Sequence, residues 1–149
     1  MKKMCAILLM MSMIISVLPG NLAFAAESKV VSRFEGTGYE VCFTVDSQWS
    51  GGFQATVQIQ NTGTAKIENW CLGFEMPGSI QNIWNAKIDS QEENRYAIKN
   101  VGWNQDIETG ETVSFGFIAG SGFEDCPQEY YMQSERILAD TDRYTMKYT

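Results

Sequence analysis

Short runs of alternating apolar and polar residues, separated by turn residues, recur along most of the chain. In the clearest run, Phe53–Gln60, phenylalanine, alanine, valine and isoleucine alternate with glutamine and threonine, and the turn residues Asn61–Gly63 follow. This period of two predicts a half-buried strand that ends in a turn. Comparable runs start at Val41, Trp70, Tyr96 and Val113. Because many short strands with regular turns favour two packed sheets, we predict an all-β fold, a two-sheet antiparallel β-sandwich of the immunoglobulin-like, Greek-key type.

Residues 1–25 have the pattern of a secretory signal peptide. Lys2 and Lys3 precede the uncharged, largely apolar run Met4–Leu18, and Ala23–Ala25 reads Ala-Phe-Ala, which is typical of a cleavage site. The apolar run is too short to span a bilayer comfortably. We therefore expect cleavage after this motif, a linker over residues 26–38, and a secreted, soluble protein with one domain and no membrane contact.

The charge of the chain restricts its partners. The sequence has 11 basic and 18 acidic residues. Removal of Lys2 and Lys3 with the signal peptide leaves nine basic residues against 18 acidic ones, a net charge of −9. A negative protein repels nucleic acid and anionic lipid, whereas a neutral polysaccharide such as cellulose carries no charge that it would repel. We expect no nucleic-acid partner and no cofactor.

Three cysteines, Cys42, Cys71 and Cys126, remain once Cys5 is removed with the signal peptide. An oxidising compartment favours disulfides, but an odd number of cysteines cannot all pair within one chain. The chain has no histidine and no Cys-x-x-Cys spacing, so we expect no metal site. In the strand pattern Cys42 and Cys71 both point away from the core. Two interpretations stay open, a cross-strand disulfide between them or two unpaired surface residues.

The four tryptophans fall into two classes. Trp49, Trp84 and Trp103 each stand among glutamine, asparagine, serine or glycine, in short turn-prone stretches. An indole normally buries its large apolar face, so these settings predict a surface that a ligand covers, and the flat ring fits the C–H face of a sugar. Trp70 instead continues the alternation with Leu72 and Phe74, which assigns it to the structural core.

Seven short motifs follow one another between Tyr39 and Met132. They are Tyr39-x-Val41, Ser47–Phe53, Asn61–Gly63, Asn69–Phe74, Ile83–Ala86, Trp103–Asn104 and Val113–Phe117. In this order they resemble a family 2 carbohydrate-binding module of the cellulose-binding type. The resemblance covers residues 39–132, to which we assign the module.

The resemblance implies a β-sandwich whose coplanar row of aromatic side chains binds crystalline cellulose. It gives this role to Trp49, Trp84 and Trp103, and it gives hydrogen bonds with sugar hydroxyls to Asn82 and Thr56. Members that prefer xylan tend to lack one of the three surface tryptophans or to turn one out of the plane. The presence of all three therefore favours cellulose.

The chain departs from the family pattern at its ends. Many members join their ends by a disulfide, but Tyr39 stands near the first cysteine position and no cysteine follows Met132. We assign residues 133–149 to a linker and, in Tyr144–Thr149, to the start of a second copy of the module in a truncated multimodular protein. Like Tyr39–Thr44, this segment begins with tyrosine and ends in an aromatic residue followed by threonine. The alternative is a last edge strand of the same domain.

We do not expect catalysis by this chain. A glycosidase needs two carboxylates about 5 to 9.5 Å apart across a bond in a cleft, whereas Glu75, Asp89 and Glu108 are expected at strand ends and turns. A copper-dependent polysaccharide oxygenase needs histidine ligands, which the sequence lacks.

We interpret the chain as a non-catalytic module that binds insoluble polysaccharide, and crystalline cellulose is the expected ligand. The module would hold an attached glycoside hydrolase at a plant cell-wall substrate. It would act as a monomer or as part of a multimodular chain. The alternatives are a xylan- or chitin-binding module and a structural immunoglobulin-like adhesion domain.

Overall fold

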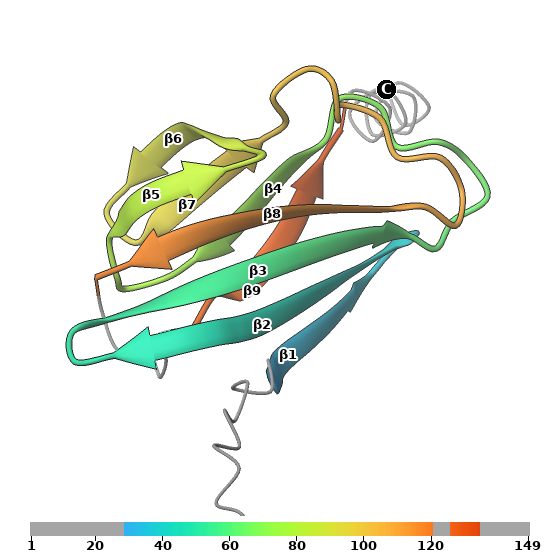
Figure 1. Ribbon diagram of the computed structural model, residues 1–149. Coiled ribbons are helices and arrows are strands. Elements are labelled where there is room, and N and C mark those ends of the chain that lie inside the picture. The colour runs from blue at the N-terminus through green and yellow to red at the C-terminus, as the bar shows by residue number, and fades with distance from the viewer. Residues whose placement is uncertain (1–28, 121–125, 135–149) are drawn as a thin grey trace, which may run out of the picture.

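The computed structural model describes residues 29–120 and 126–134, in which two antiparallel β-sheets pack face to face (Figure 1). The strands are β1 (Lys29–Gly36), β2 (Tyr39–Trp49), β3 (Gly52–Asn61), β4 (Cys71–Glu75), β5 (Ile80–Trp84), β6 (Lys87–Glu92), β7 (Arg95–Lys99), β8 (Thr112–Ala119) and β9 (Gln128–Gln133). One sheet has the order β1-β2-β3-β8-β5 and the other the order β6-β7-β4-β9. The predicted all-β sandwich is confirmed.

Two predicted regions of the chain are not covered by this description. The predicted signal peptide at residues 1–25 and the predicted second copy at residues 144–149 lie outside the described residues. Within the described part of the chain, no helix has the length and apolar character needed to cross a membrane.

The core lies between the sheets and is built from the apolar residues of the alternating runs. All four apolar residues of Phe53–Gln60 have no exposed surface, while its glutamines and threonine face outward or are half-buried. Trp70 is also fully buried, and its ring stacks on Phe115 with centroids 5.8 Å apart. Trp70 therefore lies in the core, as the alternation predicts, and it packs the start of β4 in one sheet against β8 in the other.

Residues 29–36, part of the predicted linker, instead form the edge strand β1, which pairs with β2 along its length. The linker prediction is wrong for these residues. A bulge between Val30 and Ser32 interrupts the register, which explains why the segment shows no clean alternation. In this strand the ring of Phe34 packs against Tyr39 and Tyr130, with its centroid 6.0 and 5.6 Å from theirs. This contact joins the first and last described strands without a disulfide.

The two strand cysteines face away from the core, as the alternation predicts, and of the two open interpretations the fold supports the unpaired one. Cys42 alternates with buried residues of β2 in the five-stranded sheet, and Cys71 does so in β4 of the four-stranded sheet. Their side chains therefore face opposite sides of the sandwich, and a disulfide between them is excluded by the fold. Both are free thiols, as is Cys126. Burial raises the pKa of the Cys42 and Cys71 thiols, which lowers their thiolate fraction at neutral pH.

Candidate functional site

Four of the predicted site residues lie on the outer face of the five-stranded sheet. Trp84 in β5 is opposite Gly116 in β8, and Gly116 is opposite Thr56 in β3. Asn82 lies two residues before Trp84, and Trp49 pairs with the first residue of β3. Opposed residues share a face and every second residue returns to it, so these side chains lie on one surface. That surface carries Trp49, Thr56, Asn82 and Trp84.

Two of the tryptophans are seated on glycines of the neighbouring strand. A Cβ atom added at Gly116 would stand 2.3 Å from Cε2 of Trp84, and one added at Gly52 would stand 2.8 Å from Nε1 of Trp49. Each glycine is the cross-strand partner of its tryptophan. Because glycine lacks a side chain, the indole can lie down across the backbone with its other face toward solvent. Trp49 keeps 47% of its surface exposed and Trp84 is half-buried.

Trp103 stands on the loop between β7 and β8 and is 76% exposed. The residue after it, Asn104, is buried, and its side-chain amide donates a hydrogen bond to the carbonyl oxygen of Asn85, 2.7 Å away. Asn85 directly follows Trp84 at the end of β5. Asn104 therefore holds the Trp103 loop beside the end of the strand that carries Trp84.

The same loop is fixed from the core side. The indole Nε1–H of Trp70 donates to the carbonyl oxygen of Asn104 at 2.6 Å. The side-chain oxygen of Asn104 also accepts from the backbone N–H of Val101 at 3.0 Å, which closes the loop on itself. Gly102 has a φ of +93°, a left-handed conformation that glycine adopts without strain. The core tryptophan thus helps to position the exposed one.

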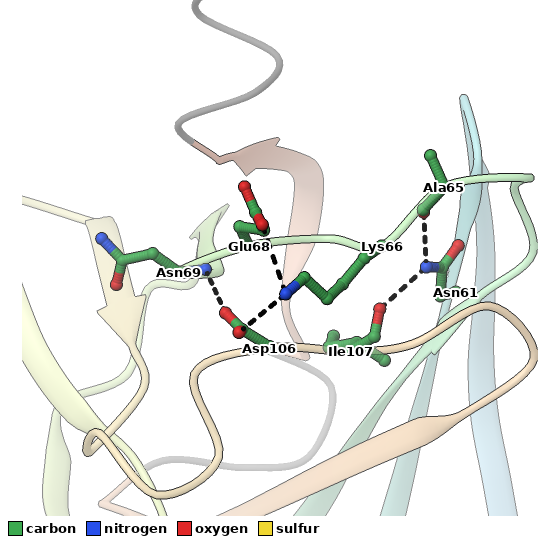
Figure 2. A network of polar contacts seen from close by, with 7 residues as sticks. All are labelled: Asn61, Ala65, Lys66, Glu68, Asn69, Asp106 and Ile107. Carbon is green, nitrogen blue, oxygen red and sulfur yellow. Dashed lines mark hydrogen bonds and ion pairs between the residues drawn. The ribbon is translucent and has the colours of Figure 1, made fainter.

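A polar network anchors the chain just after this loop (Figure 2). The carboxylate of Asp106 accepts from the backbone N–H of Asn69 at 3.2 Å and pairs with Lys66 Nζ at 3.3 Å. Next to it, the side-chain amide of Asn61 donates to the carbonyl oxygen of Ile107 at 2.9 Å. These contacts tie the segment after Trp103 to the end of β3 and the β3–β4 connection.

Thr56 and Asn82 present different polar groups. The Thr56 hydroxyl donates to Asp46 Oδ2 at 2.6 Å, which leaves its oxygen lone pairs as acceptors. The Asn82 side chain is exposed beside a bulge in β5. Sequence reasoning missed Asp46, which orients Thr56. It also missed Gln54 and Gln58, which the alternation of Phe53–Gln60 places on the outer face of β3.

The acidic residues named in the sequence analysis lie away from this surface or on turns. Glu75 pairs with Arg95 at 2.8 Å, and Asp89 pairs with Lys99, all on the four-stranded sheet. Glu108 is exposed in the β7–β8 connection. Among the described residues, no three side chains of the histidine, cysteine, aspartate and glutamate types gather in a way that could hold a metal ion.

Comparison with known families gives a match over the same region. Residues 39–134 match the family model of the cellulose binding domain. The matched range starts at the residue that begins the predicted module and ends two residues beyond it. It omits β1, which is therefore an addition to the part that the family model describes.

Individual proteins are also similar to this chain. It is 37% identical over 88 residues to endoglucanase A of Thermobispora bispora, covering 58% of this chain and 19% of the relative. Among solved structures, chitinase ChiA74 of Bacillus thuringiensis matches at 31% identity and a TM-score of 0.58, covering 62% of this chain and 15% of the chitinase. The chitin-binding domain of Chi18aC from Streptomyces coelicolor matches at 27% identity and a TM-score of 0.55, covering 66% of this chain and 93% of that domain.

Proposed function

The chain belongs to the cellulose binding domain family and its function is carbohydrate binding, and from this premise we propose that Trp49, Trp84 and Trp103 form its binding surface for insoluble polysaccharide. The observation that carries this proposal is the seating of Trp49 and Trp84 on glycines of one sheet face. A flat, preformed apolar platform loses little conformational entropy when a rigid ligand covers it. The anchored loop of Trp103 extends the same surface.

The proposed ligand is cellulose, with chitin as the second candidate and xylan as the third. The family description and the similarity to an endoglucanase support cellulose. The similarity to a chitin-binding domain supports chitin. All three tryptophans needed for a flat cellulose surface are present and exposed or half-buried. Family membership favours a polysaccharide-binding function over the alternative of a structural adhesion domain.

Aromatic stacking supplies the binding free energy in this proposal. If each ring contributes about 1–3 kcal/mol, as aromatic stacking on nucleobases does, three rings give about 3–9 kcal/mol before the costs of association. A micromolar dissociation constant corresponds to about −8.2 kcal/mol. The isolated module is therefore expected to bind with micromolar or weaker affinity. Thr56 and Asn82 would add direction through hydrogen bonds with sugar hydroxyls.

We further propose that the module is exported and serves an attached enzyme. The signal-peptide pattern at residues 1–25 supports export. The chain spans only 19% of the endoglucanase and 15% of the chitinase, which supports an accessory role in longer enzymes. By holding the polymer, such a module raises the local concentration of an attached active site. In this proposal the attached enzyme cleaves the polymer and the module only binds it.

Depletion isotherms on microcrystalline cellulose, chitin and insoluble xylan test the proposed surface. Trp49→Ala, Trp84→Ala and Trp103→Ala should each weaken adsorption to the preferred polymer by about 1–3 kcal/mol, at least fivefold, because each removes one stacked ring. Lys87→Ala, exposed on the other sheet, is the control and should adsorb like the parent. Circular dichroism confirms that each variant is folded.

Each outcome of this experiment tests a different part of the proposal. Tightest adsorption to chitin would replace cellulose as the ligand. Unchanged adsorption in all three tryptophan variants would refute the surface. Release of reducing sugar by the parent would refute the non-catalytic role.

The glycine seat gives a second test that leaves every tryptophan in place. In Gly116→Val, the new side chain occupies the space under the Trp84 indole and lifts the ring off the sheet. Adsorption should weaken by about 1 kcal/mol or more, roughly fivefold. The fold should persist, because valine is well suited to a strand, and circular dichroism checks this.

Ser114→Val places the same side chain on the same face of β8, two residues from the seat. It should leave adsorption unchanged. Equal adsorption by Gly116→Val and Ser114→Val would mean that the flat position of Trp84 does not matter for binding.

A further inference from the structure

The outer face of the four-stranded sheet carries an exposed aromatic ring of its own. Tyr131, in the edge strand β9, is 43% exposed. Its cross-strand partner is Gly73 in β4. A Cβ atom added at Gly73 would fall 1.9 Å from Cζ of Tyr131, so the ring lies directly over the glycine. This is the same construction that seats Trp49 and Trp84 on the other face.

The backbone of β9 is adjusted at this point. A register shift between Gly73 and Glu75 puts a bulge in the pairing of β4 with β9, and Glu129 within it has a φ of +52°. A bulge re-aims the side chains that follow it. Here it keeps Tyr130 in the core and directs Tyr131 outward, over β4. A buried anchor residue and an exposed ring thus stand next to each other on a short edge strand.

Charged groups that can bind hydroxyls flank the ring. Glu75 lies two residues from Gly73 on the same strand, and it pairs with Arg95 at 2.8 Å while both remain solvent-accessible. Glu75, Arg95, Glu129 and Tyr131 line one groove beside the pair, and a second groove continues past Arg95 to Glu92. A guanidinium offers several donors and a carboxylate several acceptors, a set that suits the vicinal hydroxyls of a sugar.

We propose that Tyr131 and the Glu75–Arg95 pair form a second carbohydrate site, which takes a single chain of β-1,4-linked neutral pyranose units. The choice of ligand class rests on the proposed function of the tryptophan surface. A single chain fits better than a crystal face, because one ring with raised charged side chains and grooves beside it is not a flat platform. The two sites lie on opposite faces of the sandwich, so one module could contact a solid surface and a free chain together.

Titration with soluble hexasaccharides tests this site separately from the tryptophan surface. Cellohexaose and chitohexaose are added to the ¹⁵N-labelled module in the parent, in Tyr131→Ala and in the Trp49→Ala/Trp84→Ala/Trp103→Ala variant. The parent and the triple variant should both show shifts at the amides of Gly73 and Arg95. Tyr131→Ala should bind at least tenfold more weakly at these amides, while its adsorption to microcrystalline cellulose is unchanged.

Two matched variants control for folding and for the ring. Tyr131→Phe keeps the ring and should keep hexasaccharide binding. Gln133→Ala, on the same face of β9, should also behave like the parent. Absence of shifts at Gly73 and Arg95 with both hexasaccharides, or equal binding by Tyr131→Ala and the parent, would overturn the second site. Either result would leave the tryptophan surface to be judged on its own isotherms.

Discussion

Replacing Trp70 with alanine is expected to lower the free energy of unfolding by about 3–5 kcal/mol. The indole has no exposed surface, stacks on Phe115, and donates its N–H to the carbonyl oxygen of Asn104. Alanine would leave a cavity between the sheets and an acceptor without its donor. Urea unfolding monitored by circular dichroism measures the loss as a fall in the transition midpoint at constant slope.

Two further variants separate the ring from its hydrogen bond. Trp70→Phe keeps an aromatic ring but removes the N–H, and it should cost less than Trp70→Ala. Trp103→Ala removes an indole that is 76% exposed, so it should change stability by no more than about 0.5 kcal/mol. A Trp70→Ala variant as stable as Trp103→Ala would show that Trp70 does not hold the core. The order of these three stabilities is therefore the decisive result.

The alternation of apolar and polar residues was enough to predict the strands that carry most of the core. It separated Trp70 from the exposed tryptophans because a residue within the alternation must face one side of the sheet. It failed for residues 29–36, where a bulge after Val30 breaks the period. A strand with a bulge has no clean period of two.

Strand pairing explains what the sequence analysis left open or did not find. Cys42 and Cys71 both point outward, but nothing local in the sequence places β2 and β4 in different sheets. The seats of Trp49 and Trp84 depend on register, since the glycines beneath them are cross-strand partners rather than sequence neighbours, as with Gly116. Long-range pairing decides these features, and a single sequence does not display it.

Replacing Trp49, Trp84 and Trp103 together with alanine is expected to weaken adsorption to the preferred polymer by at least about a hundredfold. Three stacked rings would supply about 3–9 kcal/mol of gross attraction, and each 1.4 kcal/mol changes affinity tenfold. The fold should survive, because none of the three is fully buried. Trp70 then remains as the only tryptophan of the four in the sequence, so its fluorescence reports directly on the core.

Salt distinguishes stacking from charge attraction in the same experiment. At about 1 M salt the screening length falls to about 3 Å, which suppresses contacts between exposed charges but leaves apolar stacking in place. The parent should therefore adsorb equally well at low and high salt, and the triple variant should adsorb poorly at both. A triple variant with an intact, buried Trp70 signal that still adsorbs would contradict the tryptophan surface. Stacking on a neutral polymer involves no ion pairs that salt could screen. Parent adsorption that disappears at high salt would therefore assign the binding to charged groups rather than to the tryptophans.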